Sequence, residues 1–97
     1  MPEISPRHTH IEKILDTISG KVVLENPASY PRDESNLYCV GAVGKVVWFA
    51  ERPEGGAHFS RVRFDDQGEK LLTYSTRGHA CEVDIKTGKL LSQISMK

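Results

Sequence analysis

The sequence predicts an α+β fold, in which one short N-terminal amphipathic helix packs on a mostly antiparallel β-meander of five to seven strands. Three observations lead to this expectation. They are an apolar stripe of helical period near the N-terminus, alternating apolar and polar residues after Gly20, and turn signals that recur through the second half of the chain. The length of 97 residues suits one domain that spans residues 1–97.

The helix is expected over residues 9–19. Its buried face would carry four apolar residues with helical spacing: Ile11, Ile14, Leu15 and Ile18. Thr9 and Glu12 have the spacing of a capping box, and Gly20 suits the C-terminal cap of a helix. Because so short a helix is not stable alone, we expect it to dock on one face of a single sheet.

Strands are expected where apolar and polar residues alternate between turn signals: residues 21–25, 37–43, 45–51, 57–64, 69–74, 79–85 and 89–95. The segment 45–51 is the most apolar and is therefore expected at the centre of the sheet. Residues 26–36 (NPASYPRDESN) are polar and contain two prolines, which predicts a long loop. Long loops on rigid scaffolds often carry binding residues.

The charge balance excludes partners that bind through bulk charge. The chain has 13 basic and 13 acidic residues and an isoelectric point of about 6.9, so we expect no nucleic-acid partner. No apolar run approaches the length of a transmembrane helix, so we expect no membrane partner. The first residues lack the basic and apolar segments of a secretory signal, which favours a cytoplasmic location.

Two cysteines, Cys39 and Cys81, lie outside any C-x-x-C motif. We interpret both as reduced strand residues, and a disulfide between them is the alternative. His79 and Cys81, together with Cys39 or His58, have the side chains of a zinc site or of a Cys–His nucleophilic pair. The spacing typical of zinc ligands is absent, so we expect no metal, no cofactor and no disulfide.

Residues 59–94 contain strand and turn signals in a defined order: VRFDDQGEKLL at 62–72, Arg77-Gly78, and VDIKTGKLL at 83–91. This segment resembles one blade of a WD40-type β-propeller. Asp84 matches the Asp of the family's W-D dipeptide, whereas Val83 stands in the place of the Trp. The resemblance covers a single blade, and 97 residues cannot close a ring of four or more blades. It implies a four-stranded local topology and a role in binding partners.

Alternation assigns the faces of two later strands. Arg61 and Arg63 point to one side of their strand, and Glu82 and Asp84 share the charged side of theirs, where the two pairs could meet across the sheet. Such a solvated face of mixed charge is a candidate docking surface, with the long loop at its rim. The candidate binding residues are therefore Tyr30, Arg32, Arg61, Arg63, Glu82 and Asp84.

The hypothesis favoured by the sequence is a small non-enzymatic protein-binding module. An inhibitor, an immunity-type partner or an assembly subunit would fit this description, because no catalytic motif is present. The alternative is a small enzyme or ligand-binding protein, with His58, His79 and Cys81 lining a pocket between helix and sheet. Homodimerisation through an uncovered apolar strip or an open sheet edge is a further hypothesis.

Overall fold

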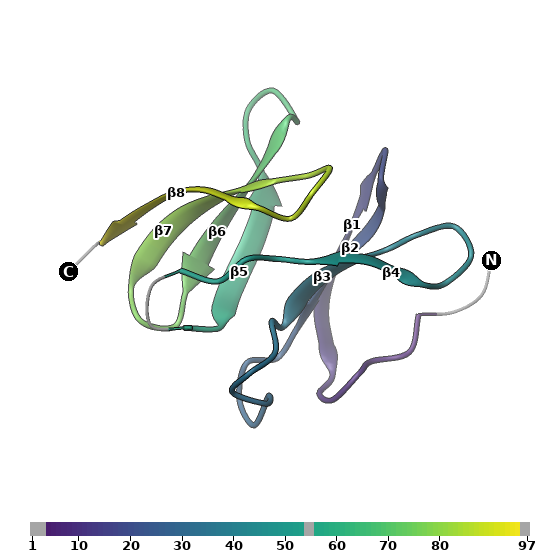
Figure 1. Cartoon of the computed structure of the whole chain (residues 1–97), viewed down its shortest axis with the longest axis horizontal. Helices are drawn as coiled ribbons and strands as arrows, with labels where there is room; N and C mark the ends of the chain where they lie inside the picture. The colour runs from purple at the N-terminus through teal and green to yellow at the C-terminus, as the bar shows by residue number, and fades with distance from the viewer. Residues whose placement is uncertain (1–3, 54–55, 96–97) are drawn as a thin grey trace.

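The computed structural model describes residues 4–53 and 56–95, and these residues form eight strands in two antiparallel sheets (Figure 1). The first sheet contains β1 (Ile11–Thr17), β2 (Gly20–Glu25), β3 (Leu37–Val40) and β4 (Val46–Phe49). The second sheet contains β5 (Phe59–Phe64), β6 (Lys70–Ser75), β7 (His79–Asp84) and β8 (Leu90–Ser95). In each sheet the strands are neighbours in chain order, so each sheet is a simple meander.

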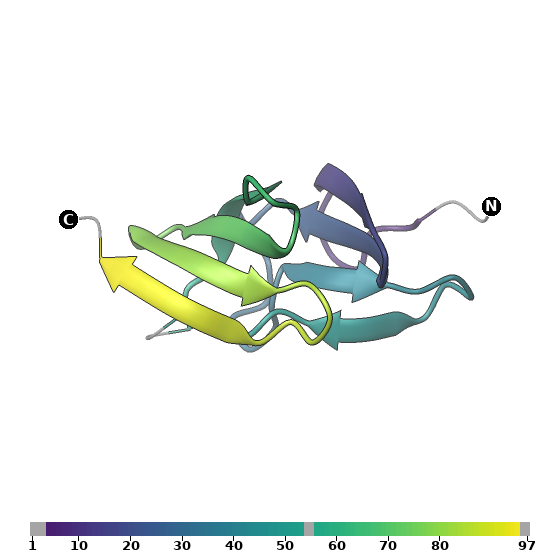
Figure 2. The ribbon, with the colours of Figure 1, turned by 90° about the horizontal axis from the view of Figure 1, so that it is seen from above.

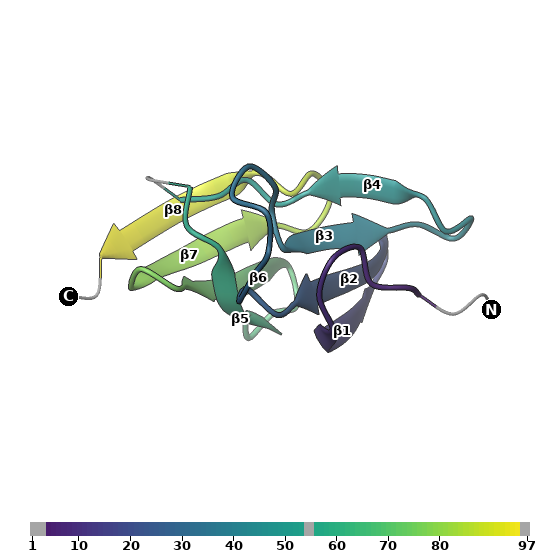
Figure 3. The same ribbon diagram turned by 90° about the horizontal axis from the view of Figure 1, so that it is seen from below.

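The two sheets lie side by side along the longest axis of the molecule, as Figures 2 and 3 show. The molecule measures 41 × 32 × 17 Å along its principal axes. The first sheet lies toward the beginning of the chain and the second toward its end, at opposite ends of the long axis. Within the described ranges, no helix has the length and apolar character needed to cross a membrane.

The core lies between the two sheets and draws side chains from both. The first sheet contributes Val22, Leu24, Leu37, Cys39 and Trp48, and the second contributes Phe59, Val62, Leu71, Cys81 and Val83. Trp48 also donates its indole N–H to the backbone oxygen of Ile85 at 2.9 Å. The chain after β4 is tied to the β7–β8 turn, because the N–H of Glu51 donates to the oxygen of Gly88 at 2.8 Å. Burial of apolar area thus joins the sheets into one unit.

The predicted α+β fold is wrong, because the fold is all-β and the expected helix is absent from the described residues. Residues 11–17 form β1, which pairs with β2. Leu15 packs against the core, whereas the neighbouring Ile14 is on the opposite face and is 42% exposed. Ile18 lies in the β1–β2 turn and is 93% exposed. The segment is rich in β-branched residues, which favour a strand once a partner strand is adjacent.

The residues that predicted helix caps make contacts between strands instead. The hydroxyl of Thr9 donates to the backbone oxygen of Asn26 at 2.7 Å, and the Asn26 amide donates to the Glu12 carboxylate at 2.9 Å. Gly20 has a φ of +136°, and a side chain there would collide with the backbone of Val40. Gly20 is therefore required by the close approach of β2 and β3 rather than by a helix end.

All seven predicted strands are present with shifted ends, and residues 26–36 form a loop as predicted. Two expectations about their arrangement are wrong. The strands form two sheets rather than one, and segment 45–51 gives β4, an edge strand rather than a central one. β4 buries Trp48 in the core but leaves Val47 and Phe49 about half exposed, so its high apolar content does not mark a central position.

Candidate functional site

One side of the second sheet faces away from the first sheet and is called here the outer face. Strand pairing aligns two rows of side chains across it: Arg63, Leu72, Glu82 and Ser92 in one row, and Arg61, Tyr74, Ala80 and Ile94 in the next. A groove of about 750 Å³ runs along this face, with Glu12 and Lys13 of β1 at its side. The outer face is thus an open concave surface with both charged and apolar side chains.

On the outer face, Glu82 has a charged partner, whereas the two arginines have none among the described residues. The Nζ atom of Lys70 lies 3.3 Å from the Glu82 carboxylate. The Ser92 hydroxyl donates a hydrogen bond to the same carboxylate at 2.9 Å. The hydrogen bonds from Ser92 and Lys70 hold the pKa of Glu82 below its ordinary value. Arg61 and Arg63 are exposed, and neither forms an ion pair with any residue that the structure describes. Two guanidinium groups on this face are therefore available to an acidic partner.

Apolar side chains lie beside these arginines. Tyr74 is 37% exposed and Ile94 is 63% exposed, and Leu72 is half-buried in the same groove. Arginine and aromatic side chains are enriched at the energetic centres of protein interfaces. The outer face therefore combines apolar contact area with two exposed arginines that form no ion pair with the described residues.

The structure brings three of the predicted binding residues together. Arg61, Arg63 and Glu82 all lie on the outer face and line its groove. The arginines do not pair with Glu82, because β6 lies between β5 and β7 and supplies Lys70 as the nearer partner. Asp84 lies at the end of β7, where its carboxylate accepts two backbone N–H groups of the β7–β8 turn at 2.7 and 3.3 Å. Asp84 therefore stabilises a turn and does not line the groove.

The other two predicted residues lie in the long loop and do not line the groove. Tyr30 is only 5% exposed, and its ring packs edge-on against His8 and His58, with ring centres 5.0 and 5.6 Å apart. His58 also contacts the backbone oxygen of Pro31 at 2.9 Å. Arg32 is exposed. Burial of Tyr30 anchors the loop, so this side chain is not free to contact a partner.

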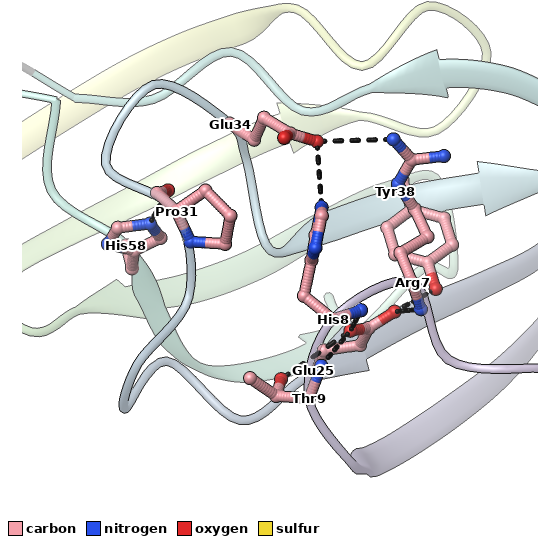
Figure 4. Close-up of polar contacts among 8 residues, drawn as sticks. All are labelled: Arg7, His8, Thr9, Glu25, Pro31, Glu34, Tyr38 and His58. Atoms are coloured by element: carbon pink, nitrogen blue, oxygen red, sulfur yellow. Dashed lines mark hydrogen bonds and ion pairs between the residues drawn. The ribbon is translucent and has the colours of Figure 1, made fainter.

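A second polar cluster, which the sequence did not indicate, centres on the buried carboxylate of Glu25 (Figure 4). It accepts the backbone N–H groups of Arg7, His8 and Thr9 at 2.6, 3.0 and 2.9 Å, and the hydroxyl of Tyr38. Burial by itself raises the pKa of Glu25, but these hydrogen bonds outweigh it, so the pKa lies below its ordinary value. Glu25 is therefore ionised and fully occupied by protein donors.

The same N-terminal segment is fastened at a second point. Glu34 accepts a hydrogen bond from the Arg7 guanidinium at 3.1 Å and lies 3.2 Å from the His8 ring nitrogen. The His8 and Arg7 contacts lower the pKa of Glu34, and burial together with the Glu25 hydrogen bond raises that of Tyr38. Each carboxylate is thus engaged by donors of the chain itself. We interpret this cluster as a structural clamp on residues 7–9.

The cysteine and histidine hypotheses have no matching geometry. Cys39 and Cys81 are both buried free thiols, and burial raises the pKa of each. The Nδ1 atom of the His79 ring lies 3.1 Å from the hydroxyl oxygen of Ser75. Across residues 4–53 and 56–95, no three metal-ligating side chains come together. The pocket expected between helix and sheet is not formed, because residues 11–17 are a strand.

Comparison with known proteins gave no match to a family model, to a curated protein or to a solved structure. The argument for function therefore depends on the geometry of the chain itself. That geometry includes two grooves, one on the outer face of the second sheet and one beside the side of the first sheet that faces away from the second.

Proposed function

We propose that this chain is a non-enzymatic protein-binding module whose docking surface is the outer face of the second sheet. The observation that carries the proposal is the pair of exposed arginines, Arg61 and Arg63, which form no ion pair with the described residues and lie beside partly exposed apolar side chains in one groove. A partner of matching chemistry presents acidic side chains next to apolar ones. An inhibitor, an immunity-type partner or an assembly subunit would act through such a surface.

Two further features support the proposal. The resemblance of residues 59–94 to a propeller blade implies a role in binding partners rather than in catalysis. The two buried cysteines are free, which agrees with the reducing cytoplasm that we propose as the location of the protein.

The experiment compares three forms of the full chain: wild type, the double variant Arg61→Glu/Arg63→Glu, and the control Arg77→Glu. Arg77 is an exposed arginine in the β6–β7 turn and does not line the groove. Each form is used to purify partners from the native source, and association rates with the recovered protein are measured at several salt concentrations. Wild type and Arg77→Glu should recover one stoichiometric protein that the double variant loses.

The salt dependence of association should also weaken in the double variant, because steering by the two arginines is screened by salt. Melting temperatures should be nearly equal, since both arginines are exposed. Equal recovery of the same partner by all three forms would show that the interface lies elsewhere.

A further inference from the structure

The two sheets have the same pattern of strand pairing. Ile14 pairs with Val23 in the first sheet as Val62 pairs with Thr73 in the second. The bulge in β1 follows the residue opposite Glu25, and the bulge in β5 follows the residue opposite Ser75. Glu25 and Ser75 correspond in this alignment as well. The first two strands of each sheet therefore pair in the same register, with the bulge at the same place.

The last two strands of each sheet correspond in the same way. Cys39 lies opposite Trp48 just before a bulge, and Glu82 lies opposite Ser92 just before a bulge. The turns that follow β3 and β7 are closed at corresponding places, since the N–H of Gly41 donates to the oxygen of Lys45 at 2.8 Å and that of Asp84 to the oxygen of Lys89 at 2.9 Å, and the second turn is one residue longer. The chain therefore contains one structural unit twice.

Corresponding residues show how the two units are packed. The buried face of the first sheet carries Leu15, Val22, Leu24, Leu37, Cys39 and Trp48. Their counterparts, in the same order, are residues of the outer face of the second sheet: Arg63, Leu72, Tyr74, Ala80, Glu82 and Ser92. The buried faces of the two sheets are therefore not corresponding faces of the repeated unit. The units are packed head to tail, as successive members of a row would be.

Head-to-tail packing leaves one face of each kind without a partner sheet. The outer face is one of them. The other is the side of the first sheet that faces away from the second, called here the rear face, whose residues Ile14, Lys21, Val23, Tyr38 and Val40 correspond to Val62, Leu71, Thr73, Cys81 and Val83 of the second sheet's buried face. Part of the rear face is covered within the chain, because Val23 and Tyr38 are buried and the Arg7 guanidinium lies 4.9 Å from the centre of the Phe49 ring. Ile14 and Asp16 are exposed. A groove of about 700 Å³ lies along the rear face.

We propose that the open part of the rear face of a second copy of this chain, around Ile14 and Asp16, docks on the outer face, so that the copies are related as the two sheets are. A heterologous contact of this kind generates a head-to-tail oligomer. The inference rests on the proposed function, because it assigns the partner of the same face.

The course of the chain at its ends agrees with this arrangement. Before β1, the oxygen of His10 accepts the N–H of Asn26 at 2.9 Å; before β5, the oxygen of His58 accepts the N–H of Thr76 at 2.8 Å. The residues that precede β1 therefore enter the first sheet as the β4–β5 connection enters the second. The end of β8 and the first described residues lie at opposite ends of the molecule (Figure 2), so head-to-tail contact would bring them toward each other across the junction.

Charge on the two free faces is complementary at one position. Leu15 and Phe64 pack against the same core within one copy. Their counterparts are Arg63 on the outer face and Asp16 on the rear face. Arg63 has no ion pair among the described residues, and the Asp16 side chain is 82% exposed, with Lys21 as its partner. Docking in the arrangement of the internal junction would place Arg63 at the position of Leu15 and Asp16 at the position of Phe64.

The experiment measures the mass of the full chain by sedimentation velocity and native mass spectrometry over a wide concentration range at low salt. Arg63→Asp and Asp16→Arg are tested singly and together, with Arg77→Asp as the matched control. Wild type and control should associate, each single variant should weaken association by roughly tenfold or more, and the double variant should recover much of it. Added salt should weaken wild-type association, which tests the charge pair without a variant.

A wild-type chain that stays monomeric at every concentration would overturn the inference. The proposed function would survive that result if another protein still bound the wild type and not Arg61→Glu/Arg63→Glu. Oligomers that ignore both single variants would also overturn it, because the interface would lie on other surfaces. Far-UV circular dichroism of each variant checks that any lost association does not come from lost folding.

Discussion

At the scale of single residues, Glu25 is a fully buried polar side chain that holds residues 7–9 against the fold. Its buried carboxylate accepts hydrogen bonds from three backbone N–H groups and from Tyr38. Glu25→Gln should lower the free energy of unfolding by about 2 kcal/mol at neutral pH, because a hydrogen-bonded charge is replaced by an amide whose NH₂ group faces donors. Chemical denaturation measures this loss.

The same residue predicts a dependence of stability on pH. The folded-state pKa of Glu25 lies below its ordinary value of 4.5, so its contribution is complete above that pH and is lost as the pH falls toward the folded value. Glu25→Gln should therefore reduce the loss of stability on acidification. The exposed residue Glu69 gives the control Glu69→Gln, which should keep the wild-type pH profile. Identical profiles for Glu25→Gln and wild type would contradict the assignment.

Two corresponding glycines allow packing to be separated from backbone strain. Gly44 and Gly88 have φ values of +84° and +75°, so alanine at either position costs roughly 1–2 kcal/mol. A Cβ at Gly88 would lie 2.5 Å from the Trp48 ring, whereas a Cβ at Gly44 has nothing within 4 Å. Gly88→Ala should thus lose about 1–3 kcal/mol more unfolding free energy than Gly44→Ala in denaturation experiments. Equal losses would mean that Trp48 does not contact this turn.

At the scale of elements, β1 gives a direct comparison between strand and helix. A helix would place Ile14 and Leu15 on one buried stripe, whereas the strand places only Leu15 against the core. Leu15→Ala should therefore cost about 2 kcal/mol and Ile14→Ala less than about 1 kcal/mol, as measured by chemical denaturation. A larger loss for Ile14→Ala would contradict the strand assignment.

The strands were predictable because each later segment alternates apolar and polar residues between turn signals. β1 was not, because Ile11, Ile14, Leu15 and Ile18 have a spacing that also suits a helix, and Thr9, Glu12 and Gly20 looked like its caps. The choice is made by the neighbouring strand β2, whose backbone groups pair with β1. Pairing with the adjacent strand of the same hairpin overrides the local helical preference here.

The repeat was hidden for a related reason. Ile14 corresponds to Val62, Val23 to Thr73 and Tyr38 to Cys81, so the spacing between counterparts changes from strand to strand. Loops of unequal length cause this change, and most counterparts differ in residue type. Alternation did predict that Arg61, Arg63 and Glu82 share one face, whereas burial of Tyr30 depends on ring contacts that no local pattern reveals.

At the scale of the whole molecule, the two structural units share one core and should therefore unfold together. The main apolar cluster draws on both sheets, so separating the sheets would expose it. Trp48, the single tryptophan of the chain, lies at the junction and reports on it by fluorescence, while far-UV circular dichroism reports on both sheets. The two signals should give coincident denaturation curves in the monomer.

A destabilising change confined to the second sheet sharpens this test. Val62→Ala removes a buried side chain of β5 and should lower stability by about 1–3 kcal/mol. If the units unfold as one, the fluorescence of Trp48 and the circular dichroism signal shift to the same lower midpoint, although Trp48 belongs to the other sheet. A circular dichroism curve that splits into two steps, with Trp48 following only one, would show that each unit folds separately and that the junction is only a contact between independent sheets.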